Sequence, residues 1–313
     1  MQYLNLNPYI KIARVDHWFK NVFMLPGIVV AVTAEPALLK LGLIYYLIVA
    51  FLSAGFVASS NYVLNEIIDA PYDKLHPVKK HRPIPSGHVN LSLAYGLWLA
   101  LAVAGFLLAY AVNLPFLIYA VLLWIMGILY NVPPIRLKDR VFLDVLSESV
   151  NNPIRLMLGW YATETSLVAP ISLVIAYWML GAFFMAIKRF AEFRMINDRT
   201  IAAGYRRSFS AYDEEKLLIS IVYYAVSFGL FFGVFLLRYR VELILSLPLL
   251  AGFMAWYIHI GFKHDSPAQY PERLFRQKGF AAYTSLCAIV MMALLYIDIP
   301  MIAEVFSPTI TLN

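Results

Sequence analysis

Amide and acidic side chains recur at a spacing of four residues within the stretch 61–87. Asn65, Asp69 and Asp73 follow this spacing, and Glu66 lies beside the first of them. On a helix, residues four apart lie on the same face, where like charges repel each other unless a cation lies between them. Oxygen ligands of this kind suit Mg²⁺, which commonly joins carboxylates to the phosphates of a substrate. The four residues are therefore candidate metal ligands.

Basic residues follow these acidic residues closely along the chain. Lys79 and Arg82 lie in a segment with Pro77, Pro83 and Pro85, whose rings restrict the backbone φ angle. Metal ligands followed by basic residues on a stiff loop are typical of a diphosphate site. The alternative is a helix end followed by an ordinary basic loop at a membrane surface.

Pro71 bears on how these side chains are arranged. Because proline disfavours helical geometry at the preceding residue, we expect the helix to end near Asp69 and Asp73 to lie on the following loop. Ionisable residues at the end of a long apolar segment are usually functional, since burying them in a membrane is costly.

The composition is that of a protein with many membrane-spanning segments. The chain has 313 residues, of which 61% are hydrophobic and 14% charged, whereas soluble domains are about 45–50% apolar and about 25% charged. Nine apolar segments are long enough to cross a bilayer, so we expect an all-α bundle of nine transmembrane helices. These segments cover residues 10–33, 38–69, 91–112, 115–131, 141–162, 168–192, 216–237, 241–262 and 279–297.

The basic residues predict the orientation of this bundle. Most of the 25 Lys and Arg residues fall on the N-terminal side of the nine spans, and the positive-inside rule places that side in the cytoplasm. We expect an integral protein of a prokaryotic plasma membrane, surrounded by membrane lipids, with its C-terminus outside. A net charge of +6 could indicate nucleic-acid binding, but the position of the charges between apolar segments favours membrane topology and no nucleic-acid partner. The single Cys287 excludes an intramolecular disulfide.

The fifth expected span carries charged residues at helical spacing. Lys138 precedes this span, and Asp144, Glu148 and Arg155 continue within it. Polar residues on one face of a spanning helix line the interior of the bundle or a wet cavity. The alternative is an ion pair between Arg155 and Glu148 that only orders the bundle.

Two other spans also carry residues that could bind phosphate. The sixth span ends in Lys188, Arg189 and Glu192, where arginine can bind a phosphate through two nitrogens and lysine acts as a point charge. The alternative is an ordinary solvated helix end. Lys20 and Asn21 lie near the start of the first span and are further candidates.

The pattern N-E-x-x-D-x-x-x-D, followed by H-P-x-K-x-x-R-P and a glycine, resembles the first aspartate-rich motif of the UbiA superfamily of intramembrane prenyltransferases. The likeness covers most of the chain and is closest to the decaprenyl-phosphate phosphoribosyltransferases. It includes residues 18–21, 137–155, 188–192 and 271–272, and the Lys-Arg-x-Ala-Glu stretch indicates the phosphoribosyl branch. The resemblance implies a single transmembrane domain over residues 1–313, with a central cavity open to the cytoplasm and a Mg²⁺-dependent site.

This sequence departs from the family pattern at two places. Glu66 stands where the family usually has Asp, so whether it binds metal or only forms hydrogen bonds stays open. Aromatic-acceptor members carry a second aspartate-rich motif after the sixth span, where this sequence has Lys188, Arg189, Glu192 and Asp198. One metal-binding cluster with added basic residues suits a donor that carries one diphosphate and a further phosphate on its ribose.

The resemblance therefore implies transfer of 5-phosphoribosyl from phosphoribosyl diphosphate to a polyprenyl phosphate. The candidate contacts to Mg²⁺ and the diphosphate are Asn65, Glu66, Asp69, Asp73, Lys79 and Arg82. The candidate contacts to the ribose and its 5-phosphate are Lys188, Arg189 and Glu192. The candidate contacts to the acceptor phosphate are Lys20, Lys138 and Arg155, and Asn21 is a further candidate for substrate binding.

Two alternative functions remain at this point. One is a prenyltransferase that moves a prenyl group from a prenyl diphosphate to an aromatic or other acceptor. The other is a membrane transporter, although the charges gather at one end of the spans and the sequence has no evident inverted repeat. The length of the polyprenyl chain and the oligomeric state stay open.

Overall fold

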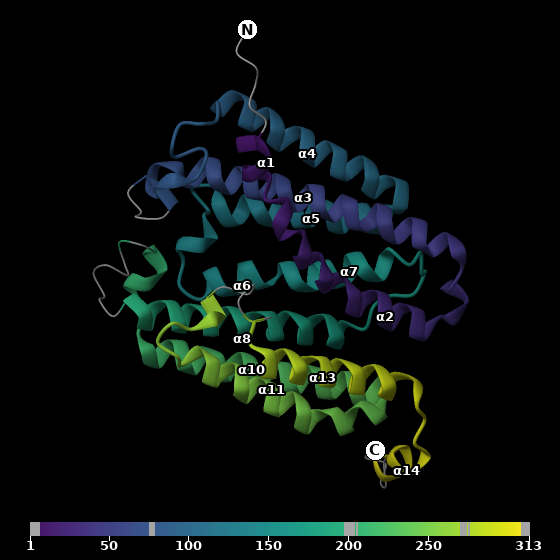
Figure 1. Ribbon diagram of the computed structural model, residues 1–313. Helices are drawn as coiled ribbons and strands as arrows, with labels where there is room; N and C mark the ends of the chain where they lie inside the picture. Colours follow the sequence, from purple (N-terminus) through teal and green to yellow (C-terminus); the bar gives the residue numbers. More distant parts are fainter. Residues whose placement is uncertain are drawn as a thin grey trace. The chain divides into compact units, whose positions relative to one another are not determined.

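The computed structural model describes residues 7–74, 79–196, 204, 206–269, 274 and 276–307. Over these residues the chain is helical and contains no strand, which confirms the all-α prediction. It divides into two compact units, unit 1 with Met1–Ala169 and unit 2 with Pro170–Asn313 (Figure 1). Each unit is described by itself below.

Eight helical segments in the described part of the chain are long and apolar enough to cross a membrane. Such a set confirms a membrane protein with many spans, whereas the predicted count of nine is not confirmed. The eight segments are Asn7–Ala34, Leu41–Asp73, Leu91–Val112, Leu114–Asn131, Ile171–Ile196, Glu214–Tyr239, Val241–Gly261 and Lys278–Tyr296. The orientation of the termini and the type of membrane stay predictions.

The segment expected as the fifth span forms two short helices instead. These are α6 (Leu143–Ser149) and α7 (Asn151–Tyr161), which meet at Val150. Pro153 lies in the first turn of α7, where the missing N–H removes no intrahelical hydrogen bond. The proline therefore favours a new helix start where hydropathy alone predicted one continuous span.

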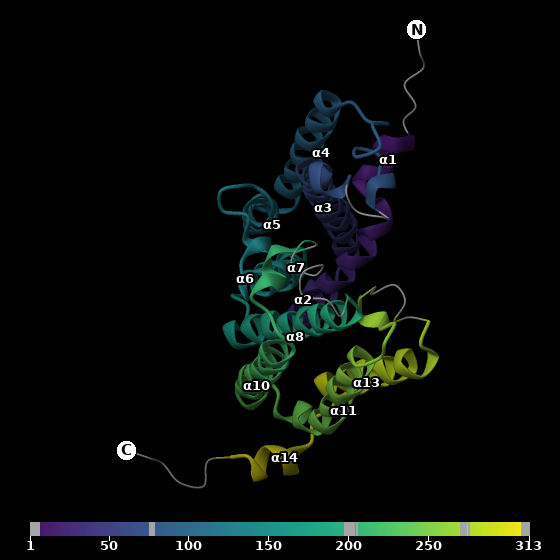
Figure 2. The same cartoon turned by 90° about the vertical axis from the view of Figure 1, so that its left-hand side faces the viewer.

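Helix α3 (Leu41–Asp73) is the central helix of unit 1. Helices α4 (Leu91–Val112) and α5 (Leu114–Asn131) lie alongside it, as both ribbon views show (Figures 1 and 2). The Ser53 hydroxyl of α3 donates to the carbonyl of Gly105 in α4 at 2.8 Å. At the start of α5, the Asn113 side chain accepts from the Phe116 amide at 2.8 Å and caps the helix.

The N-terminal segment of unit 1 packs across α3 and α7. It consists of α1 (Asn7–Ala13), the 3₁₀ helix η1 (Val15–Met24) and α2 (Leu25–Ala34). The Trp18 indole donates to the Ser59 hydroxyl at 2.9 Å, and its ring covers Gly55 so closely that a Cβ there would lie 2.6 Å away. A Cβ on Gly159 of α7 would collide with the carbonyl oxygen of Met24. These small residues allow η1 to approach α3 and α7 closely.

The end of α3 differs from the sequence prediction. Pro71 lies inside the helix, which continues to Asp73, so the expected end near Asp69 is wrong. In the last turn the proline removes a single N–H donor, and the Lys74 amide still donates to the Ala70 carbonyl at 3.1 Å. Asp73 consequently lies on the helix, one turn beyond Asp69.

Unit 2 is built from two pairs of packed helices. Helix α8 packs along α10, and α11 packs against α13 (Figure 2). Their bounds are α8 (Ile171–Ile196), α10 (Glu214–Tyr239), α11 (Leu247–Gly261) and α13 (Lys278–Tyr296), followed by α14 (Pro300–Val305). An aromatic cluster joins α8, α11 and α13, in which the Tyr257 ring lies 4.9 Å from that of Phe184 and 5.9 Å from that of Phe280.

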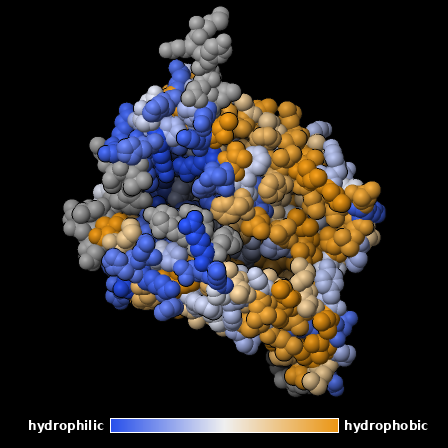
Figure 3. Space-filling view, in the orientation of Figure 1, coloured by the Kyte–Doolittle hydropathy of each residue, from blue (hydrophilic) through white to orange (hydrophobic). Residues whose placement is uncertain are grey.

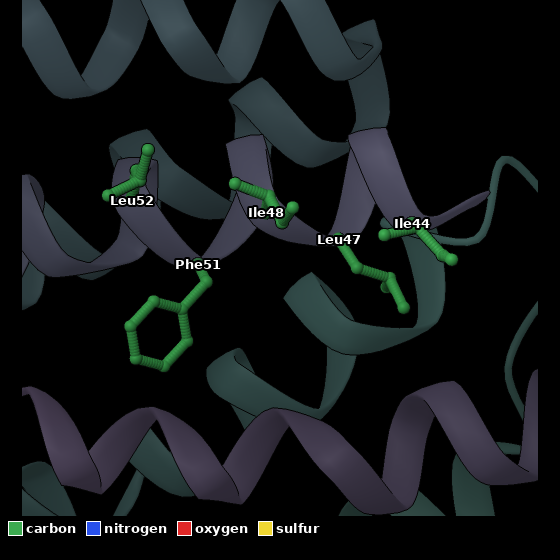
Figure 4. A pocket seen from close by; sticks show the side chains of 5 residues that line it. All are labelled: Ile44, Leu47, Ile48, Phe51 and Leu52. Carbon is green, nitrogen blue, oxygen red and sulfur yellow. The ribbon is translucent and has the colours of Figure 1, made fainter. Parts of the chain in front are cut away.

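Polar and apolar residues separate along unit 1. In Figure 3 hydrophilic residues gather at the upper left, where Figure 1 draws the end of α3, and hydrophobic residues cover the upper right. An apolar hollow of about 300 Å³ lies on the other half of α3 (Figure 4). Its lining residues are Ile44, Leu47, Ile48, Phe51 and Leu52. This hollow is not the predicted polar cavity, and a central cavity open to the cytoplasm stays a prediction.

Candidate active site

Asp69 of α3 lies at the centre of a network of charged and polar groups. Its Oδ1 is 2.6 Å from Nζ of Lys138 and 3.1 Å from Nη2 of Arg136. Its Oδ2 accepts a hydrogen bond of 3.2 Å from Nδ2 of Asn65. Two cations meet at one carboxylate oxygen, so the network carries more positive charge than Asp69 alone balances.

Asn131, the last residue of α5, joins two members of this network. Its Oδ1 accepts from Nδ2 of Asn65 at 2.5 Å and from Nζ of Lys138 at 2.9 Å. Its Nδ2 donates to the Gly127 carbonyl at 2.8 Å. Asn131 was not among the residues predicted from the sequence.

Arg136 is a second residue that the sequence prediction missed. Its Nε donates to Asp139 at 2.9 Å, its Nη1 donates to the Asn131 carbonyl at 3.2 Å, and its guanidinium lies 5.0 Å from the centre of the Tyr72 ring. Its φ of 33° is in the left-handed region, which non-glycine residues adopt when their surroundings hold them there. Arg136 lies two residues before Lys138 in the sequence, but the direction of its side chain depends on the left-handed backbone conformation of Arg136 itself.

Asp73 forms the second ion pair of the site. Its Oδ2 lies 2.6 Å from Nη1 of Arg82, which follows the 3₁₀ helix η3 (Lys79–His81). This contact returns the basic loop to the end of α3. Lys79 begins η3 and is half-buried. The structure thus brings together Asp73 and Arg82, two residues that the sequence analysis assigned to one candidate diphosphate site.

Glu66 is oriented toward the loop that contains Ile84. Its Oε1 accepts from the Ile84 amide at 3.2 Å, its Oε2 lies 3.6 Å from Nη2 of Arg14, and the residue is only 2% exposed. Through these contacts, the Glu66 carboxylate connects α3 to the loop that contains Ile84 and to the N-terminal segment that contains Arg14. They bear on the open question of whether Glu66 binds metal.

Arg155 and Asn21 lie together elsewhere in unit 1. Nε of Arg155 donates to Oδ1 of Asn21 at 3.4 Å, and Nη1 donates to the Asn151 carbonyl at 3.3 Å. Nζ of Lys20 lies 5.7 Å from the centre of the Tyr62 ring, one turn before Glu66 on α3. The sequence prediction grouped Lys20, Asn21 and Arg155, and the structure joins the last two directly.

Glu148 of α6 contacts the end of α5. The Tyr130 hydroxyl donates to its Oε2 at 2.9 Å, and the Tyr130 ring lies 5.9 Å from Nζ of Lys138. Asp144, one turn earlier on α6, is fully buried. These contacts place α6 beside the segment that carries Lys138.

Three predicted site residues belong to unit 2. On α8, Nη1 of Arg189 lies 3.3 Å from Oε2 of Glu192, and Arg189 is 1% exposed. Lys188 precedes them and is half-buried. The other residues to which the sequence analysis pointed, Asp198 and residues 271–272, lie outside the described residues.

The donor atoms at the end of α3 fit Mg²⁺ in chemical kind. In the described ranges, no three acidic, histidine or cysteine side chains lie close enough to share one metal ion. Mg²⁺ does not require three, because it usually takes one or two carboxylates and completes its shell with water and substrate phosphates. Asp69 and Asp73 supply two carboxylates one helical turn apart, and Asn65 supplies a carbonyl oxygen one turn before them.

These features define a helical membrane protein whose carboxylates and cations are suited to a metal and phosphate groups. The chain belongs to the UbiA prenyltransferase family, whose model matches residues 21–286 and therefore both units.

Curated relatives include decaprenyl-phosphate phosphoribosyltransferases of two bacteria. The protein of Mycolicibacterium smegmatis is 31% identical over 209 residues, which cover 66% of this chain and 63% of the relative. That of Corynebacterium glutamicum is 30% identical over 208 residues, which cover 65% of this chain and 59% of the relative. The matches thus span less than two thirds of these two relatives.

Solved structures show the same fold. A UbiA homolog from Archaeoglobus fulgidus bound to GPP and Mg²⁺ aligns with a TM-score of 0.69 and 19% sequence identity. The alignment covers 93% of this chain and 100% of that one. This likeness supports the arrangement of helices on which the site is built.

Proposed function

We propose that this protein transfers 5-phosphoribosyl from phosphoribosyl diphosphate to a polyprenyl phosphate, with Mg²⁺ as cofactor. The observation that carries the proposal is the pairing of two carboxylates of α3 with cations from other segments. Asp69 lies 2.6 Å from Lys138, and Asp73 lies 2.6 Å from Arg82. The end of α3 therefore offers oxygen ligands for a metal beside donors for phosphate oxygens. The named activity of the relatives at about 30% identity supports the phosphoribosyl donor.

Asn65, Asp69 and Asp73 would hold the metal in this proposal. Bound there, Mg²⁺ would neutralise part of the diphosphate charge and favour its departure. Glu66 belongs to the ligand set predicted from the sequence, but its contacts with Ile84 and Arg14 support a role in anchoring the loop.

Basic residues would stabilise the leaving diphosphate. The bond between ribose C1 and the diphosphate oxygen breaks, and diphosphate leaves with the electron pair of that bond. Arg136 and Arg82, which pair with Asp69 and Asp73, would donate to the oxygens on which negative charge develops, with Lys79 nearby in the sequence. Lys138 was a sequence-based candidate for the acceptor phosphate, and its contact with Asp69 supports a role at the diphosphate instead. One such donor contributes about 10²–10³ in rate.

The acceptor would need little activation. A phosphate monoester is anionic near neutral pH, so its oxygen can form the new bond to ribose C1 without a strong general base. Arg155 is 7% exposed in a unit that spans the membrane, and such a buried cation is usually functional. With Lys20 and Asn21 it is our candidate for the acceptor phosphate, and the polyprenyl tail would lie in the lipid-facing region.

Unit 2 carries the residues that the sequence analysis predicts to contact the ribose and its 5-phosphate. Lys188, Arg189 and Glu192 of α8 combine two cations and a carboxylate within five residues. The cations suit the 5-phosphate, and the carboxylate suits the ribose hydroxyls. We propose a cytoplasmic location for the loops of this site, because the donor is soluble.

The test is an assay with purified full-length protein, Mg²⁺, radiolabelled phosphoribosyl diphosphate and a panel of polyprenyl phosphates. We expect label to enter the lipid fraction and diphosphate to be released in equal amounts. Product formed only from prenyl diphosphate and an aromatic or glyceryl-phosphate acceptor would instead identify a prenyltransferase. Substrate flux into liposomes without any donor would identify a transporter.

A further inference from the structure

Asn131 occupies a buried position between three segments of unit 1. It is 4% exposed, ends α5, and contacts Asn65 of α3 and Lys138 of the segment after α5. Its main-chain carbonyl also accepts from Nη1 of Arg136 at 3.2 Å. One residue thus joins a candidate metal ligand to two candidate diphosphate contacts.

The hydrogen bonds determine which way the Asn131 carboxamide faces. Its Nδ2 is directed at the Gly127 carbonyl, which can only accept a hydrogen bond. Its Oδ1 must therefore face the other side, where Lys138 offers an ammonium group that can only donate. Both contacts require the same orientation of the amide.

The orientation of Asn131 determines that of Asn65 in turn. Because Oδ1 of Asn131 can only accept, Asn65 must present its Nδ2 to it, and this nitrogen also donates to Oδ2 of Asp69. The carbonyl oxygen of Asn65 consequently takes part in neither of these two hydrogen bonds. This oxygen is the atom of Asn65 that can bind a metal ion.

Asn131 also determines where the Lys138 ammonium lies. Lys138 is buried, and its Nζ lies between Oδ1 of Asp69 at 2.6 Å and Oδ1 of Asn131 at 2.9 Å. A flexible lysine side chain requires such fixed acceptors to hold one position. Without Asn131, Lys138 would keep its contact with Asp69 but lose the second contact that fixes its direction.

We infer that Asn131 is a positioning residue for the metal-diphosphate site. By accepting from Nδ2 of Asn65, it would keep the carbonyl oxygen of that residue for the metal, and it would hold Lys138 for its contact with the diphosphate. The inference rests on the proposed function for the nature of the ligand, a metal diphosphate. It assigns no direct contact between Asn131 and the substrate.

The experiment compares three variants by the stabilisation that Mg²⁺ and inorganic diphosphate together give to the purified full-length protein. Asn131→Leu removes the acceptor, and Asn131→Asp retains an acceptor for Asn65 and Lys138. Asn113→Leu is the matched control, because Asn113 caps the opposite end of α5 and contacts Tyr161. The readout is the diphosphate concentration that gives half of the maximal rise in unfolding temperature.

We expect Asn131→Leu to raise this concentration about tenfold or more, as when one hydrogen bond to a charged group is lost. Asn131→Asp should stay within about threefold of wild type, and Asn113→Leu should lower the unfolding temperature without changing the midpoint. If Asn131→Leu does not fold, Asn131→Ser replaces it, since its short hydroxyl cannot reach both partners.

Equal losses in the Leu and Asp variants would overturn the inference, and so would a wild-type midpoint in the Leu or Ser variant. A wild-type protein that Mg²⁺ and diphosphate do not stabilise would overturn it as well. If the three variants behave as expected but phosphoribosyl diphosphate is not a substrate, the proposed function fails and the inference about Asn131 stands.

Discussion

Oδ1 of Asp69 lies 2.6 Å from Nζ of Lys138, although 69 positions separate the two residues in the sequence. The contact forms because α5 lies alongside α3 and the chain after α5 turns back at the end of α3. Arg136, on the same turn, reaches the same carboxylate oxygen. The first two predictions below depend on this contact.

Asp69→Asn should reduce turnover by about 10²–10³ or more, because it removes the charge that binds the metal while keeping the shape of the side chain. The variant should stay folded in detergent, with a lower unfolding temperature, because Lys138 and Arg136 lose the charge of their partner. Asp16→Asn is the matched control, since the Asp16 side chain is 80% exposed at the start of η1. Near-normal turnover in Asp69→Asn would contradict the site assignment.

Lys138→Met and Asp69→Asn should be strongly non-additive. If both residues act on one metal diphosphate, the double variant should lose about as much activity as the more damaging single variant. The measurement is kcat/KM for all four proteins of the cycle. Losses that multiply would mean that Lys138 and Asp69 act independently despite their contact.

Glu66→Gln should leave the Mg²⁺ concentration for half-maximal activity within about threefold of wild type, since glutamine keeps an acceptor for the Ile84 amide. Asp73→Asn should raise that concentration by about tenfold or more, because it removes a proposed metal ligand. A magnesium titration of both variants distinguishes the two roles. A large shift in Glu66→Gln would restore Glu66 to the metal ligands.

Gly159→Ala should destabilise unit 1, because the new Cβ would collide with the main-chain oxygen of Met24. Overpacking of this kind costs about 1–3 kcal/mol, which should appear as a lower unfolding temperature. Gly96→Ala in α4 is the control, since its Cβ would meet nothing within 4 Å. Equal stability of the two variants would show that η1 and α7 do not pack closely at Gly159.

Lys188→Ala should weaken competitive inhibition by ribose 5-phosphate about tenfold and leave inhibition by diphosphate unchanged. This result is expected if Lys188 contacts the phosphate on the ribose and does not contact the diphosphate. Lys216→Ala is the control in the same unit, where Lys216 pairs with Asp213 at 3.0 Å and is half exposed. Equal weakening of both inhibitors would contradict the division of roles.

The candidate metal ligands were predictable because their spacing is a local property of one helix. The helix end was not, since the sequence rule for Pro71 concerns an average preference and α3 continues to Asp73. The role of Glu66 was left open for a similar reason. Its spacing fits the metal ligands, whereas its contacts are with Ile84 and Arg14.

Hydropathy predicted a membrane protein correctly, whereas the span expected over residues 141–162 is not confirmed. Residues 141–162 are apolar enough on average to read as a span, yet they form α6 and α7. The segment also contains charged residues, namely Asp144, Glu148 and Arg155. A new helix, α7, begins within it and has Pro153 in its first turn. The predicted orientation depends on the number of spans and is untested for that reason.

By itself, the sequence determined the class of protein, the family and the helix that carries the candidate metal ligands, since hydropathy and four-residue spacing are local properties. Only the tertiary structure decided which cation faces which carboxylate. Arg136 and Asn131 became members of the site because packing brings the end of α5 to the end of α3. Such contacts depend on how helices distant in the sequence pack together, which no local pattern encodes.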